Sequence, residues 1–348
     1  MGARSSSSLQ SFFDNFYRSG RDASGATPGG ATLFSVSGGN ATSTGGGYKY
    51  FYFTSPGNLT VQKVSGSEDF EMSFLLIGGG GSGTSTGGGG GGAGAFVQKV
   101  DYPISSVPQS SVNWAVVIGD GDATESTGSG DSSTFTIPTS PKTFTATGGS
   151  PGRQTNGLSN GGSGGGGGRS SSSGGAASVP QTIDGSGNTP DTGIGYDGAR
   201  GRNSGPGSGG TGGGGGGAGA NGEEGAANPS SNADGGRGGL GRTAFLGDTN
   251  VSSSYGTPGP SAGRWFAGGG GGGSHTSGTG RGGYAPNGGG GAMGSPASSP
   301  GYGGSPSGTV NTGGGGGGGG GTSNAFVGAS SAGMSGICIV KIDTTILS

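Results

Sequence analysis

Short runs of β-branched and aromatic residues, spaced by polar turn residues, recur through positions 32–147 and predict β-strands. Tyr48–Phe53 alternates aromatic residues with mixed partners, and Phe70–Ile77 leads directly into a run of glycines. Further strands are expected at Leu33–Val36, Asn58–Val64, Ala95–Val100, Trp114–Ile118, Ser133–Ile137 and Thr143–Thr147. Because these runs are short and are separated by Gly, Pro, Asn and Asp, the pattern predicts an all-β sandwich or jelly roll.

One more apolar strand is expected near the C-terminus, at Ile337–Ile342. We expect it to return to the sheet formed by the earlier strands, which makes residues 148–335 one long insertion. The chain then divides into a β framework, residues 32–147 and 336–348, and a glycine-rich insertion to which residues 78–94 also contribute.

The first 31 residues show a different pattern, which predicts a short amphipathic helix ending near Gly20. Its apolar positions fall at i, i+3, i+4, i+7 and i+8, namely Leu9, Phe12, Phe13, Phe16 and Tyr17. Two interpretations stay open for this segment. It covers an open side of its own β core, or it docks the protein onto a larger assembly, with the stretch 22–30 serving as a tether.

Glycine changes this picture, because it supplies 100 of 348 residues while hydrophobic residues supply only 26%. Ordering a backbone costs roughly 1–2 kcal/mol per residue, so these glycines cost on the order of 100 kcal/mol without burying side chains. Glycine runs can therefore become ordered only together, each hydrogen-bonded to several neighbours. Extended helices with three residues per turn, of the polyproline II type, allow this; a collagen helix is excluded because no strict Gly-X-Y period exists.

The residues that usually carry catalysis are scarce. The net charge is −2, and the single cysteine, Cys338, lies in an apolar strand and is expected to be buried. The single histidine, His275, lies beside a glycine run and is expected to be solvated. We find no phosphate-binding loop and no nucleophile elbow in a strand-turn-helix context, so neither an enzyme nor a cofactor is predicted.

One acidic cluster, Asp120, Asp122 and Glu125, has oxygen ligands of the kind that calcium prefers, although a plain polar loop is the favoured interpretation. The sequence shows neither a cleavable signal peptide nor an apolar run long enough to span a membrane, and no membrane association is expected.

The order of these elements resembles the glycine-rich domain of phage virion proteins, notably tail-fibre and appendage proteins. The resemblance spans residues 32–343 and rests on Tyr48–Phe53, Asn58–Val64, Phe74–Ile77, Gly78–Ala93, Trp114–Asp120, Phe144–Gly149, Trp265–Gly273, Gly313–Gly321 and Ser335–Ile342. It implies a jelly-roll-like sandwich carrying bundled polyglycine II helices, similar to phage fibre-tip adhesins and to the glycine-rich ectodomain of anaplastic lymphoma kinase receptors. The family has Ile-Val-Ile where this chain has Ile337-Cys338-Ile339, and its module does not include the first thirty residues.

The resemblance predicts a structural protein on the exterior of a virion, synthesised in the host cytoplasm. Residues 1–30 would attach it to other virion proteins, and the remainder would bind a host cell-surface glycan or protein, as a homo-oligomer with a trimer as the first guess. Surface-binding candidates are the aromatic residues near glycine turns: Tyr284, Tyr302, Trp265 and Phe266. For Trp265 and Phe266 the favoured alternative is that they cap the glycine bundle.

Two other functions remain open. A purely architectural decoration or cement protein of the capsid would have the same sequence features. Arg237-Gly-Gly and Arg281-Gly-Gly-Tyr284 also resemble the arginine–glycine segments of RNA-binding proteins, although the acidic pI of about 5.3 argues against that function.

Overall fold

The computed structural model describes residues 33–85, 87–123, 128–153, 161–170, 173–181, 183–203, 210–226, 234–275, 280–286, 289–294, 308–322, 325–326 and 329–348. The expected helix at Leu9–Tyr17 lies outside these residues, as do Glu125 and Tyr302.

The described part of the chain is mostly β, with two five-stranded antiparallel sheets packed as a sandwich. The first sheet has the order β1 (Leu33–Gly38), β4 (Gly57–Ser65), β7 (Val112–Val117), β8 (Ser133–Ile137) and β9 (Lys142–Ala146). The second has the order β2 (Ala41–Gly45), β3 (Tyr48–Phe53), β17 (Ile337–Asp343), β5 (Phe70–Ile77) and β6 (Phe96–Ile104). The predicted strands are therefore confirmed, whereas the short polar strand β2 was missed.

Helices contribute little to the described residues. They comprise two single-turn 3-10 helices, η1 (Ala244–Leu246) and η2 (Thr344–Ile346), and no helix of seven or more residues. None of the helices found there has the length and apolar character needed to cross a membrane.

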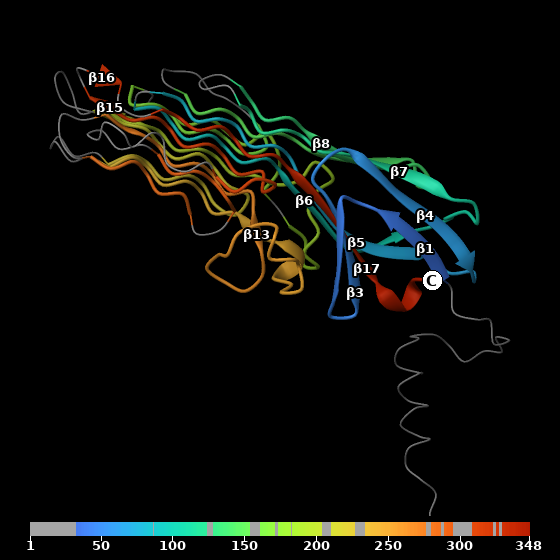
Figure 1. Cartoon of the computed structure of the whole chain (residues 1–348). Helices are drawn as coiled ribbons and strands as arrows, with labels where there is room; N and C mark the ends of the chain where they lie inside the picture. The colour runs from blue at the N-terminus through green and yellow to red at the C-terminus, as the bar shows by residue number, and fades with distance from the viewer. Residues whose placement is uncertain are drawn as a thin grey trace, which may run out of the picture.

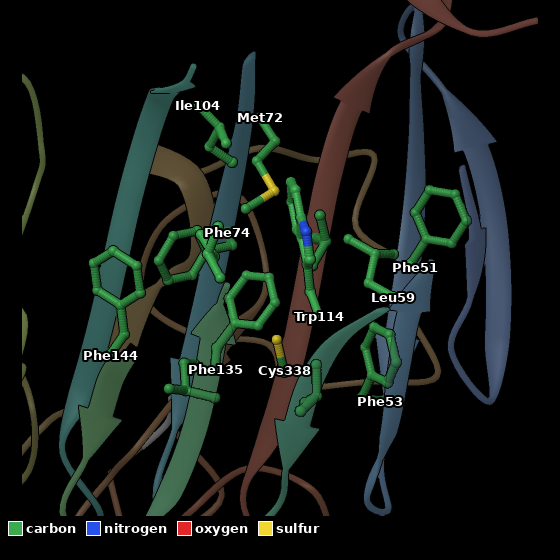
Figure 2. Packing of buried hydrophobic residues seen from close by; sticks show 14 of the residues in the cluster. Phe51, Phe53, Leu59, Met72, Phe74, Ile104, Trp114, Phe135, Phe144 and Cys338 are labelled. Atoms are coloured by element: carbon green, nitrogen blue, oxygen red, sulfur yellow. The ribbon is translucent and has the colours of Figure 1, made fainter. Parts of the chain in front are cut away.

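An aromatic core fills the space between the sheets (Figure 2). The ring of Phe74 on β5 meets Phe135 and Phe144 of the facing sheet edge to face, with centroids 5.1 and 4.7 Å apart. Trp114 is fully buried beside them. Cys338 points into the same core and is fully buried, as expected, and this burial raises the pKa of its thiol.

The last strand completes the second sheet from far along the sequence. β17 lies between β3 and β5 and is antiparallel to both, which confirms that the C-terminal strand returns to the framework. The outer face of this sheet is covered by a second apolar cluster that includes Phe245 and Phe266 from the region between the glycine runs. In the same place Asp248 accepts hydrogen bonds from Tyr50 (2.7 Å) and Lys341 (2.6 Å).

The glycine segments leave the sandwich side by side and form an elongated body that extends far beyond it (Figure 1). We call this body the glycine bundle; among the described residues it comprises 78–95, 119–122, 128–131, 147–153, 161–169, 173–177, 194–203, 210–226, 234–241, 266–275, 280–286, 289–294, 312–322 and 329–336. At its far end lies a small sheet of β10 (Arg202–Asn203), β11 (Gly210–Thr211), β14 (Ser274–His275), β15 (Gly321–Thr322) and β16 (Ala325–Phe326). Near its base β12 (Arg242–Thr243) pairs with β13 (Trp265–Phe266).

Hydrogen bonds inside the bundle follow a period of three, as residues 88–95 show. The amides of Gly88, Gly91 and Gly94 donate to the carbonyl groups of Gly319, Gly316 and Gly313 on one neighbouring segment. Those of Gly89, Gly92 and Ala95 donate to the carbonyl groups of Arg153, Ser150 and Thr147 on a second segment. Those of Gly90 and Ala93 donate to the carbonyl groups of Gly213 and Gly216 on a third. The carbonyl groups of this segment accept from three further segments, 78–84, 163–166 and 270–273. One segment is thus bonded to six described neighbours, whereas a β-strand is bonded to two at most.

Candidate functional surface

Most positions inside the bundle admit only glycine, because the neighbouring backbones leave no room for a side chain; the exceptions are small residues such as Ala93, Ser150 and Ser163. A Cβ added at Gly91 would lie 2.1 Å from the carbonyl oxygen of Gly81, and one at Gly215 would lie 2.0 Å from that of Gly91. Both distances are far below van der Waals contact, and in both cases the obstructing atom belongs to backbone. The interior segments therefore carry only glycine and a few small buried residues, and larger side chains occur at the periphery.

A peripheral segment admits one side chain in every three residues. In the segment 234–241, Asp234, Arg237 and Leu240 are exposed. The glycines between them point inward: a Cβ at Gly236 would lie 2.0 Å from the Glu223 carbonyl oxygen, and one at Gly238 would lie 2.1 Å from that of Gly269. Three residues per turn place the three outward side chains in one row, about 9 Å apart at a rise of 3.1 Å per residue.

Four such segments lie next to one another and present a common outer face. We define this outer face as residues 194–203, 220–226, 234–241 and 280–286. Gly222 donates to the carbonyl of Asp197 (3.0 Å), Glu223 to that of Arg237 (2.8 Å), and Gly238 to that of Tyr284 (3.1 Å). The backbone lattice therefore fixes the position of each outward side chain relative to the others.

Ion pairs cross this face between neighbouring segments. Glu224 accepts from Arg200 Nε at 2.6 Å and from Arg202 Nε at 3.1 Å, and these hydrogen bonds lower the pKa of its carboxyl group. Arg237 Nε lies 3.9 Å from a carboxylate oxygen of Glu223, with both side chains mostly exposed. Such exposed pairs contribute only about 0–1 kcal/mol each, so they position side chains more than they stabilise the bundle.

Tyr284 stands beside these charges with its ring 46% exposed. The guanidinium carbon of Arg237 lies 6.0 Å from the ring centroid, within reach of a cation–π contact. Exposed Arg281 lies three residues earlier on the same segment, and Met293 lies on the next segment, which bonds Gly283 through the Gly294 amide (2.8 Å).

Two of the other aromatic candidates belong to the base of the bundle. Phe266 is fully buried in the second apolar cluster and offers no surface for a ligand. Trp265 is half-buried, donates from Nε1 to the carbonyl of Ser261 (3.2 Å), and is covered by Gly259, where a Cβ would lie 2.4 Å from the indole ring. Both positions agree with the capping role that the sequence favoured.

The histidine prediction was wrong. His275 is only 7% exposed, because β14 places it between β11 and β15, where it pairs with Gly210 and Gly321. Its Nδ1 lies 2.6 Å from Arg169 Nη1. Since arginine has donors only, Nδ1 accepts this hydrogen bond and the ring proton resides on Nε2.

The acidic cluster gains no support as a metal site. Asp120 is exposed and Asp122 is half-buried. The Asp122 carboxylate packs against Gly128, where an added Cβ would lie 2.1 Å from it. In the part of the chain that is described, no group of three or more His, Cys, Asp or Glu side chains is placed to hold a metal ion.

Sequence reasoning missed the outer face as a unit. The arginines were noticed as Arg-Gly-Gly motifs and Tyr284 as a lone aromatic, but their common face depends on which segments are neighbours. The period of three in residues 234–241 and 281–284 was the available signal. Comparison with protein-family models, with curated proteins and with solved structures finds no match to this chain.

Proposed function

We propose that this chain is a structural protein displayed on the exterior of a phage or virus particle, where it attaches the particle to the surface of a host cell. In this proposal the sandwich is jelly-roll-like and the bundle consists of polyglycine II helices. Residues 1–31 dock the protein onto other virion proteins, and several copies assemble, with a trimer as the working hypothesis.

One observation carries the proposal: the bundle is a long projection that holds outward side chains on a rigid backbone lattice. Each residue of its central segment is tied to neighbours on all sides, so the outer face is positioned with little conformational freedom left to lose. A surface of that kind suits binding, because rigid presentation reduces the entropy cost of forming a complex.

Nucleic-acid binding is less well supported by the same surface. The arginines of the outer face number four, Arg200, Arg202, Arg237 and Arg281, and its carboxylates also number four, Asp197, Glu223, Glu224 and Asp234. A face with no net charge lacks the excess of positive charge on which phosphate binding depends. The Arg-Gly-Gly spacing also has a packing explanation here, since the inward positions admit only glycine.

Binding of the purified protein to intact candidate host cells tests the proposal, together with adsorption of particles that lack the protein. We expect saturable binding to one host and loss of adsorption by the deficient particles. Normal adsorption, combined with particles that disintegrate on heating or dilution, would instead identify an architectural decoration or cement protein.

A further inference from the structure

Tyr284 differs from the other aromatic residues of the described chain. Among the aromatic residues whose burial the structure describes, it alone is exposed, and the others are buried or half-buried. A large, rigid aromatic ring left open on a fixed backbone is a common feature of binding surfaces.

The arginines of the outer face differ in how closely carboxylates pair with them, and the two least closely paired, Arg237 and Arg281, lie near Tyr284. Glu224 is engaged by both Arg200 and Arg202. Arg237 makes only the 3.9 Å contact with Glu223. Within the described residues Arg281 has no ion pair, because Asp234 accepts from its main-chain N–H (2.9 Å) rather than from its guanidinium group.

Among the described residues, Arg281 therefore has no ion pair and Arg237 has only a loose one, so both guanidinium groups can bind an anion near the exposed ring of Tyr284. Arg237 lies beside Tyr284 on the neighbouring segment, and Arg281 lies one turn away on the same segment, about 9 Å along the axis. A pyranose with a carboxylate matches this arrangement. The apolar face of a sugar ring can stack on tyrosine, and a carboxylate can accept two parallel hydrogen bonds from arginine.

We infer that Tyr284, Arg237 and Arg281 form a binding site for carboxylated sugars. The inference rests on the proposed function and specifies the ligand class for the outer face. The close backbone packing at Gly236, Gly238 and Gly283, where an added Cβ would lie 1.9–2.1 Å from a backbone oxygen, fixes where Arg237 and Tyr284 leave the backbone before any ligand arrives.

The test is calorimetric titration of the full-length protein with an oligogalacturonate and with its methyl ester, in which the carboxylates are neutral. We expect the ester to bind at least tenfold more weakly, because hydrogen bonds between charged partners are roughly twice as strong as neutral ones. Tyr284→Ala and Arg237→Gln should each weaken oligogalacturonate binding about tenfold or more. Val117→Thr, an exposed change on β7 of the sandwich and outside the outer face, is the control and should leave binding unchanged.

Four results would overturn the inference. Polyphosphate binding as tightly as oligogalacturonate, with no effect of Tyr284→Ala, would show general polyanion attraction. A concentration-dependent oligomer that Tyr284→Ala dissolves would show that the face contacts a second copy of this chain. Host-cell binding that is saturable and unaffected by Tyr284→Ala, with no oligogalacturonate binding, would refute the site while leaving the proposed function intact; loss of both kinds of binding in the wild-type protein would refute both.

Discussion

Replacing Gly91 by alanine should strongly destabilise the protein, although glycine-to-alanine changes at unstrained, unobstructed positions usually stabilise a folded protein. The new Cβ would lie 2.1 Å from the Gly81 carbonyl oxygen, roughly 1.3 Å short of the 3.4 Å at which ordinary contact begins. The obstacle is backbone, and it is fixed by two hydrogen bonds of 2.9 Å, from Gly316 N–H to Gly81 O and from Gly81 N–H to Gly92 O. Relieving the overlap therefore requires breaking bonds between segments.

The free-energy cost of the lost hydrogen bonds exceeds the gain that alanine brings to the unfolded chain. Two buried hydrogen bonds left unmade cost about 1–3 kcal/mol each, or about 2–6 kcal/mol together. The restricted unfolded chain of the alanine variant returns only about 0.4–1 kcal/mol. Gly91→Ala should thus lower the free energy of unfolding by about 2–5 kcal/mol, a large part of the roughly 5–15 kcal/mol typical of a folded protein.

Urea denaturation, followed by the fluorescence of Trp114 and Trp265 and by circular dichroism, measures the effect. Gly185→Ala is the matched control, because nothing lies within 4 Å of its added Cβ and its φ lies outside the left-handed range. The control should be neutral or slightly stabilised. If Gly91→Ala unfolds at the same urea concentration as Gly185→Ala, the close-packed lattice does not exist and our reasoning fails.

Three other properties can be checked in the same preparations. Burial alone would raise the pKa of Asp248, but hydrogen bonds, the first from Lys341, outweigh it and hold that pKa at about 2, against an ordinary 3.8. The lowered pKa contributes about 2 kcal/mol to the free energy of unfolding, which should be complete above pH 4 and lost as pH falls towards 2. The free energy of unfolding of Asp248→Asn should not show this decrease. Iodoacetamide should leave Cys338 unmodified in the folded protein and label it fully in urea, because its thiol is buried and its pKa raised; labelling of the folded protein would contradict the core packing. Glu224→Gln should change the free energy of unfolding by less than about 1 kcal/mol, since its ion pairs are exposed, and a larger loss would mean that these pairs stabilise the bundle.

The strands of the framework could be predicted because those of the first sheet bury one side chain in two, and β3, β5 and β17 of the second sheet are nearly continuous apolar runs that are buried on both faces. Ser133–Ile137 alternates visibly and forms β8, whereas Trp114–Ile118 is apolar throughout and was predicted from its β-branched and aromatic residues. β2 was not predicted because Ala41–Gly45 contains no large apolar residue, and it forms a strand through its pairing with β3. His275 was misjudged because a glycine-rich context suggests a solvated loop, whereas packed glycine backbones bury what they adjoin as fully as side chains do.

The bundle could be predicted only in kind. A glycine run has no side-chain pattern, so its sequence does not reveal which runs become neighbours. The six partners of residues 88–95 come from six separate stretches, of which only 78–84 is near in sequence. The absence of a chain-wide Gly-X-Y period also has a physical reason. Interior segments such as 212–217 meet backbone on all sides and are all glycine, whereas peripheral segments such as 234–241 leave one side open.

An alanine scan of residues 234–241, with the urea midpoint measured for each variant, tests the lattice most directly. Our account predicts a period of three. Asp234, Arg237 and Leu240 should tolerate alanine, whereas Gly235, Gly236, Gly238 and Gly239, where a Cβ would lie 2.0–2.1 Å from a backbone oxygen, should not. A period of two would indicate a β-strand instead, and uniform tolerance would show that this segment is not packed against its neighbours at all.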